Sequence, residues 1–173
     1  DLGQRYRARG VASTYNEPLV STEWSLAIFR LAREAGLKTC YVTNGFASPE
    51  ALDLLCPLLD AANVDLKCFA DKGYRQLGGR LQPVLDTIRH LVARGVWVEA
   101  TTLVVPGFND SPGELRDCAE FLASVSADLP WHVSAYHAAY EWRQGPERTP
   151  LAAIRRTVET GRAAGLHYVY AGN

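Results

Sequence analysis

The stretch EAGLKTCYVTNG, residues 34–45, decides the fold class of this 173-residue chain. Its pattern is that of a helix end, a glycine, a strand of β-branched and aromatic residues, and polar residues that end the strand. The same layout returns in ARGVASTYNEP from Ala8, in ARGVWVEATTLVVPG from Ala93 and in AAGLHYVYAGN from Ala163. Because glycine readily adopts the left-handed conformation that closes a helix, each phrase predicts a helix-closing glycine. These glycines are Gly10, Gly36, Gly95 and Gly165.

Helices and strands alternate along the rest of the chain. Two further predicted strands, at 63–67 and 131–137, lack the preceding glycine but also end in polar residues. Amphipathic spacing predicts the helices, together with start signals such as Ser48-Pro49 and the capping-box pattern Ser111-Pro112-Gly113-Glu114. The predicted helices cover 21–35, a segment from 49 onward, 81–93, 112–124 and 149–164.

This alternation, with its short connections, predicts an α/β fold with parallel strands and right-handed crossovers. Six strands suit a partial (β/α)6 TIM-like barrel, because a full eight-stranded barrel usually takes more residues. A doubly wound open sheet is the alternative, and the lack of G-x-G-x-x-G after the first strand weakens its dinucleotide-binding form. We expect a single domain over residues 1–173, truncated at the first strand and incomplete at both ends, since the chain opens on Asp1 and contains no methionine.

The composition excludes several classes of protein. Hydrophobic residues make up 47% of the chain and the formal net charge is −1, so neither disorder nor a nucleic-acid surface is expected. No apolar run approaches the ~20 residues of a membrane helix, and DLGQRYRARG at the start lacks the apolar core of a secretory signal. We therefore expect a cytoplasmic protein without a membrane partner. The four cysteines form no close pair, which favours reduced core thiols over metal ligands.

Polar groups collect at the predicted carboxyl ends of the strands, where parallel α/β folds place their sites. Two carboxylates, an amine, an imidazole, amides and hydroxyls would suit a zwitterionic ligand with a hydroxylated part. The set, in chain order, is Asn16, Glu17, Thr43, Asn44, Asp65, Lys67, Thr101, Val105, Ser134, Tyr136, His137, Gly172 and Asn173.

Some members of this set have simpler structural explanations. Asp65 and Lys67 could pair with each other, because alternating strand residues point to one face. Asn44-Gly45 alone is more often a turn than a ligand contact. Three histidines outside the set are interpreted as structural: His90, His132 and His167.

The chain resembles the radical S-adenosylmethionine (SAM) enzymes, from about Gly10 to Asn173. The resemblance rests on TYNEP, YVTNG, NVDLK, TTLVVPGFND, WHVSAYH and YVYAGN, in this order and spacing. The closest branch is that of the AmmeMemoRadiSam system enzymes, relatives of the pyruvate formate-lyase activating enzyme. The resemblance implies a (β/α)6 partial barrel that holds SAM across its open top.

The resemblance also implies roles for residues. Tyr15-Asn16-Glu17 occupies the place of the motif that holds the SAM ammonium group. Asp65-Leu66-Lys67 matches the Asp-Leu-Lys that contacts SAM, and Leu103 to Pro106, with Val105, matches the strand that flanks the adenine. His137 matches a histidine at the end of a later strand. Thr43, Asn44 and Thr101 complete the expected SAM site, and no residue is assigned as the chemical catalyst.

The family binds its 4Fe-4S cluster through CxxxCxxC in a loop upstream of TYNEP. The spacing of Cys40, Cys56, Cys68 and Cys118 does not match this motif. We therefore expect the cluster ligands in an upstream segment absent here, and residues 1–173 alone to be inactive. The implied partners are a protein or small-molecule substrate and an external electron donor such as flavodoxin or ferredoxin.

Two alternative functions remain open. Lys67 could form a Schiff base in a metal-free lyase or aldolase if a dry site lowered the pKa of its amine. Otherwise the chain could be a cluster-less barrel that binds SAM or a partner protein.

Overall fold

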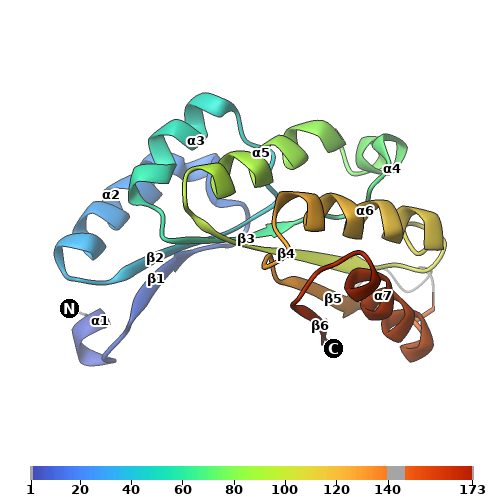
Figure 1. Ribbon diagram of the computed structural model, residues 1–173. Helices are drawn as coiled ribbons and strands as arrows, with labels where there is room; N and C mark the ends of the chain where they lie inside the picture. The colour runs from blue at the N-terminus through green and yellow to red at the C-terminus, as the bar shows by residue number, and fades with distance from the viewer. Residues whose placement is uncertain (1, 140–146, 173) are drawn as a thin grey trace. The chain divides into compact units, whose positions relative to one another are not determined.

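The computed structural model describes residues 2–139 and 147–172. In this part of the chain the strands are parallel and form one sheet, in the order β1-β2-β3-β4-β5-β6 (Figure 1). They are β1 Gly10–Ser13, β2 Lys38–Thr43, β3 Ala61–Asp65, β4 Trp97–Val104, β5 Trp131–Ala135 and β6 Val169–Gly172. This order confirms the predicted sequence of βα units. Asn173, which belonged to the last predicted strand end, lies outside the described residues.

The α-helices fall between these strands, except α1, which precedes β1, and the five predicted helices lie close to their predicted ranges. They are α1 Leu2–Arg5, α2 Thr22–Glu34, α3 Pro49–Leu55, α4 Asp71–Gln76, α5 Leu81–Ala93, α6 Pro112–Val125 and α7 Leu151–Ala163. Two 3-10 helices, η1 Pro18–Ser21 and η2 Cys56–Leu58, also lie between strands. The prediction missed α1 and α4, whose short segments carry little helical periodicity. No helix in the described ranges is long and apolar enough to cross a membrane.

The chain divides into two compact units. The first comprises Asp1–Asp65 and Gln82–Val98, and the second comprises Leu66–Leu81 and Glu99–Asn173. The prediction of a single domain over residues 1–173 stays a prediction.

The first unit is built around the β2 strand and the helix before it. Phe29 on α2 and Tyr41 on β2 are almost fully buried, and their ring centroids lie 5.6 Å apart. Burial is the main cause that raises the pKa of the Tyr41 phenol. Alternate β2 residues, such as Thr39 and Thr43, are buried on the same side, so β2 presents one face to the core and Val42 is exposed on the other. This alternation fixes which strand-end side chains remain accessible.

The second unit packs α7 against β5 and β6. Trp131 on β5 is fully buried, and its indole N–H donates to the Thr102 hydroxyl at 2.9 Å. Gly161 of α7 permits this close contact, since a Cβ there would lie 2.9 Å from Trp131 Cε3. The helix therefore lies directly on the strands whose carboxyl ends carry the predicted site.

Three of the four predicted helix-closing glycines are confirmed. Gly36, Gly95 and Gly165 have φ of 73°, 76° and 102° at helix ends. The prediction for Gly10 is wrong: this residue begins β1, where a Cβ would lie 2.9 Å from the Lys38 carbonyl oxygen. Glycine is required at this position by close approach of the neighbouring strand rather than by a helix end.

The helix start signals are confirmed, with one change. The hydroxyls of Ser48 and Ser111 each accept from a backbone N–H three residues on, at 3.3 Å. Glu114 does not complete the expected capping box. Its carboxylate instead accepts from the backbone N–H of Phe69 at 2.7 Å, because the loop after β3 brings this half-buried donor within reach.

Candidate functional site

In the first unit, Glu17 connects the chain after β1 to the end of β2. Its Oε1 accepts from Leu19 N at 3.0 Å and from the Thr43 hydroxyl at 2.6 Å. Its Oε2 accepts from Asn44 N at 2.6 Å. Glu17 is also the N-cap of η1, and Pro18 occupies the first helical position. The structure thus brings together Glu17, Thr43 and Asn44, three of the predicted site residues.

This carboxylate is largely occupied by the protein itself. An ionised carboxylate offers about four acceptor positions, and three are used by donors of this chain. Glu17 therefore holds the β1 and β2 strand ends in register, with at most one position for a ligand. The side chains beside it, Asn16 and Asn44, are exposed.

Asn44 and Gly45 form the turn that their sequence suggests. Asn44 Oδ1 accepts from Phe46 N at 2.8 Å, which is an Asx-turn. Gly45 has φ of 71°, and a Cβ on it would lie 2.6 Å from Val64 Cγ1. The turn is thus packed against Val64 at Gly45, whereas Asn44 is exposed.

In the second unit, Asn109 organises the loops after β3 and β4. It is 1% exposed, and its Nδ2 donates to the carbonyls of Lys67 at 2.6 Å and Leu103 at 2.8 Å. Its Oδ1 accepts from Val105 N at 2.7 Å. One buried amide thus fixes the backbone of two predicted site residues, Lys67 and Val105. Sequence reasoning missed Asn109 as a site residue, although it lies in the PGFND segment that carried the resemblance.

Further hydrogen bonds fix the segment Leu66-Lys67 relative to β4. Leu66 N donates to the Thr101 carbonyl at 2.9 Å, and the Thr102 hydroxyl donates to the Leu66 carbonyl at 2.9 Å. Lys67 N donates to the Tyr74 hydroxyl at 3.1 Å. The Lys67 backbone is therefore held rigidly while its side chain extends from this frame.

A cavity of about 540 Å³ opens where Lys67, Leu103 and Val105 meet. The remaining lining residues are Gln76, Leu77, Pro106, Gly107, Phe108 and Tyr136. A mostly apolar wall with one amine at its rim suits a flat, weakly polar ring that carries a charged group. The volume lies within the usual range for small-molecule sites.

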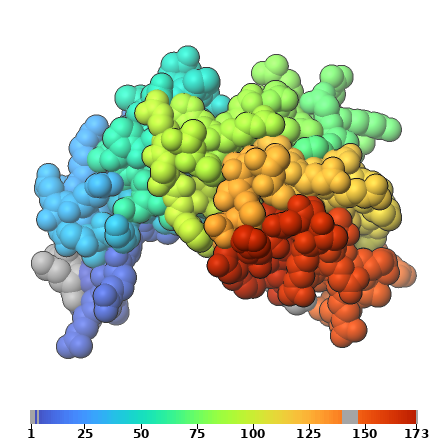
Figure 2. Space-filling model, in the orientation of Figure 1, coloured from blue at the N-terminus to red at the C-terminus, as the bar shows by residue number. Residues whose placement is uncertain are grey.

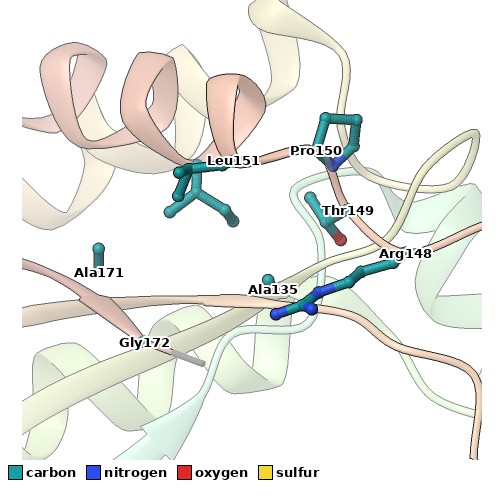
Figure 3. Close-up of a pocket in the computed structure, with 8 residues that line it drawn as sticks. Ala135, Arg148, Thr149, Pro150, Leu151, Ala171 and Gly172 are labelled. Carbon is teal, nitrogen blue, oxygen red and sulfur yellow. The ribbon is translucent and has the colours of Figure 1, made fainter.

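A second cavity of about 600 Å³ lies between the ends of β5 and β6 and the start of α7. Figure 3 shows Arg148 extending from the segment before α7 toward Ala135, with Gly172 on the adjacent strand. Thr149 anchors this wall: its hydroxyl donates to the Val104 carbonyl at 2.6 Å, and its N–H donates to the Tyr136 carbonyl at 3.0 Å. These two cavities thus adjoin strand carboxyl ends.

Of the other predicted residues, Asp65 and His137 lie at strand ends, whereas the placement of Thr101 at a strand end was wrong. Asp65 is the last residue of β3 and belongs to the first unit, whereas Lys67 belongs to the second. Thr101 lies within β4, two residues before Leu103 of the cavity wall. His137 follows β5 and is exposed. Their joint action on one ligand stays a prediction.

The histidines interpreted as structural have protein partners. His132 Nε2 lies 2.6 Å from Glu99 Oε2, and its ring stacks on Tyr170 at 5.3 Å. His167 Nδ1 lies 2.8 Å from Asp128 Oδ1. His90 Nε2 lies 3.3 Å from an Asp53 carboxylate oxygen.

The described cysteines do not fit a 4Fe-4S centre. No group of three or more His, Cys, Asp or Glu side chains within residues 2–139 and 147–172 is placed to hold a metal. Burial raises the pKa of the Cys56, Cys68 and Cys118 thiols, which favours the protonated form, whereas clusters bind thiolates.

The sequence model of the Radical SAM superfamily matches residues 1–122. The chain belongs to this superfamily. This radical SAM chain is 34% identical over its full length to an uncharacterized protein of Methanocaldococcus jannaschii, of which it covers 51%. It is 27% identical over 84% of its length to pyruvate formate-lyase 1-activating enzyme of Escherichia coli K12, covering 61% of that protein. A (2S)-3-sulfopropanediol sulfolyase activating enzyme of Bilophila wadsworthia is 28% identical over 74% of the chain and is covered over 43% of its own length.

The radical SAM chain thus spans about half the length of the curated relatives it matches. Among solved structures, a domain of a pyruvate-formate lyase-activating enzyme from Bacteroides vulgatus aligns with a TM-score of 0.79 at 18% identity, over 95% of this chain and 99% of that one. SuiB of Streptococcus suis bound to S-adenosylmethionine aligns with a TM-score of 0.72 at 15% identity, over 91% of this chain and 38% of that one. These likenesses confirm the predicted partial barrel. The family's cofactors are SAM and a 4Fe-4S cluster.

Proposed function

We propose that the intact protein is a radical SAM enzyme of the glycyl-radical activating type. It would take one electron from a reduced 4Fe-4S cluster and break the S–C5′ bond of SAM, which yields methionine and a 5′-deoxyadenosyl radical. The radical then takes a hydrogen atom from a glycine Cα of a partner protein. An external donor such as flavodoxin or ferredoxin would then reduce the cluster again. Similarity to several proteins named as activating enzymes supports this assignment.

The observation that carries the proposal in this chain is the loop frame built by Asn109. It holds the Lys67 and Val105 backbone beside a mostly apolar cavity. The adenosyl group of SAM fits such a wall, with Lys67 as the cationic partner of the SAM carboxylate. In the first unit, Glu17 and Asn16 are the residues proposed for the SAM ammonium group, and Glu17 mainly positions the neighbouring oxygen atoms that would accept from it. Asp65, Leu66, Thr101 and His137 complete the proposed set.

The cluster chemistry lies outside the described residues in this proposal. The buried, protonated thiols of Cys68 and Cys118 serve as core packing. The chain's own contribution is to bind SAM, to orient its 5′ carbon and to exclude water from the radical.

The proposal is tested by the transfer of a deuterium label from the partner protein to 5′-deoxyadenosine. Intact protein is incubated anaerobically with SAM, reductant and a partner enzyme labelled with α-deuterated glycine. Deuterium in 5′-deoxyadenosine and a glycyl-radical EPR signal on the partner are expected. Formation of labelled 5′-deoxyadenosine from a small molecule instead would refute the activating role. A borohydride-trapped adduct on Lys67 with a carbonyl substrate, without 5′-deoxyadenosine, would favour a Schiff-base enzyme.

A further inference from the structure

Thr149 is a buried residue in an otherwise exposed segment of the second unit. It is 3% exposed, whereas Glu147, Arg148 and Pro150 beside it are exposed. Figure 2 shows the segment from residue 147 onward, in orange-red and red, at the surface of this unit. Figure 3 shows Thr149 on the chain that leads into α7, with its hydroxyl oxygen in red. A hydroxyl buried in this way needs hydrogen-bond partners, because burial removes it from water.

The partners of this hydroxyl are the two backbone groups at which the β4–β5 ladder would continue. Val104 and Ala135 are the last paired residues of these strands. In a parallel ladder with this register, the next bond runs from Tyr136 N to the Val104 carbonyl. The Thr149 hydroxyl stands at this bond: it donates to the Val104 carbonyl at 2.6 Å and accepts from Tyr136 N at 2.8 Å.

The two strands lie farther apart at this end of the ladder than at the other. Tyr136 N is 3.4 Å from the Val104 carbonyl oxygen. Where the ladder begins, Ala100 N is 2.9 Å from the Pro130 carbonyl oxygen. A backbone hydrogen bond ordinarily spans about 2.7–3.2 Å, so the last bond is stretched beyond the usual range. The Thr149 hydroxyl supplies both groups with a shorter bond and holds the strand ends apart.

The residues that follow this point on both strands form the wall of the cavity next to Lys67. Val105 comes directly after Val104, and Tyr136 is 6% exposed; both line this cavity. We propose that Thr149 is a positioning residue of the SAM site, a wedge that sets the distance between these two walls. The inference rests on the proposed function, because it takes the adenosyl group as the ligand of this cavity. Thr149 itself lines the other cavity, so it acts on the SAM site only through its backbone partners.

The alternative is that Thr149 merely fastens the start of α7 to the sheet. Its backbone N–H donates to the Tyr136 carbonyl at 3.0 Å, and this bond forms whichever side chain is present. Fastening of α7 therefore needs no hydroxyl, whereas the separation of Val104 and Tyr136 does. Changes confined to the Thr149 side chain thus distinguish the two roles.

Binding of SAM to the intact protein, measured anaerobically by isothermal titration calorimetry, tests the wedge. Thr149→Ala lets Tyr136 N and the Val104 carbonyl form a direct ladder bond, and it should raise the dissociation constant of SAM about tenfold because the two walls move together. Thr149→Ser keeps the hydroxyl and should bind SAM as the wild type does. Thr157→Ala is the matched control, because Thr157 is 1% exposed but its hydroxyl donates within α7, to the Ala153 carbonyl at 2.9 Å. It should leave SAM affinity unchanged.

A crystal structure of Thr149→Ala measures the geometry independently of SAM. The distance from Tyr136 N to the Val104 carbonyl oxygen should shorten from 3.4 Å to about 2.9 Å. An unchanged distance, unchanged SAM affinity of Thr149→Ala or weakened binding by Thr149→Ser overturns the wedge and leaves the proposed function in place. Equal losses in Thr149→Ala and Thr157→Ala overturn it as well. A wild-type protein that binds no SAM refutes the proposed function, and the role of Thr149 in a SAM site with it.

Discussion

Replacing Glu17 by glutamine should loosen the ends of β1 and β2. Glutamine keeps one carbonyl oxygen as the acceptor for Leu19 N and the Thr43 hydroxyl. In the wild-type chain Asn44 N donates to Glu17 Oε2 at 2.6 Å, and the variant places an NH2 group at that position instead. One charge-assisted hydrogen bond is lost and two donors face each other. Such a bond contributes ~1.5–3 kcal/mol, which corresponds to about ten- to a hundredfold in an equilibrium constant.

Amide hydrogen exchange measured by NMR would detect this loss. The Asn44 N–H should exchange about ten- to a hundredfold faster in Glu17→Gln, and the urea midpoint should fall with an unchanged m-value. SAM affinity should fall together with this local loosening. Glu34→Gln, an exposed change at the end of α2, is the control. Unchanged exchange at Asn44 together with weakened SAM binding would refute the positioning role and make Glu17 a direct ligand.

Three further predictions concern stability. Asn109→Ala should lower the free energy of unfolding by about 3 kcal/mol, measured by urea titration, because it removes three side-chain hydrogen bonds to the backbone, each of which contributes about 1 kcal/mol. Gly45→Ala should cost more than about 1 kcal/mol, since φ is 71° and the new Cβ would lie 2.6 Å from Val64 Cγ1. Partial burial tends to raise the pKa of Asp60, but hydrogen bonds from Lys38 and Thr39 outweigh it and lower that pKa below its usual value. The stabilisation by Asp60 is therefore complete above the unfolded-state pKa of about 3.9 and is lost as pH falls through the lower folded-state pKa, so Asp60→Asn should flatten the loss of stability in acid.

The order of the sheet was predictable because the helix–glycine–strand phrase repeats in the sequence. Gly36, Gly95 and Gly165 are required by positive φ, which is a local property. Gly10 has a non-local cause, the approach of the Lys38 carbonyl, and the pattern alone misassigned it. Helix α4 was missed for a related reason: its Tyr74 is 4% exposed and anchors the Lys67 backbone, a contact that no local spacing encodes.

The position of Glu17 and Lys67 beside strand ends was predictable from the sequence, but their contacts within the chain were not. That either residue binds a ligand stays a prediction. The sequence could not indicate that the Glu17 carboxylate is used by three donors of its own chain, because two of them lie on a different strand end. Likewise, the sequence around Asn109 predicts a loop residue, and its role depends on the carbonyls of Lys67 and Leu103, which lie on other segments of the fold.

The most direct measurement is an NMR titration of the 15N-labelled 173-residue chain with SAM. The central claim is that the adenosyl group binds in the cavity framed by Asn109, next to Lys67 and Val105. The account predicts that the largest amide shifts cluster at Lys67, Val105 and Phe108. It also predicts that Lys67→Ala weakens binding about ten- to a hundredfold, whereas Lys72→Ala on exposed α4 leaves it unchanged. Shifts confined to the cavity beside Arg148, or equal affinities of the two lysine variants, would contradict the account.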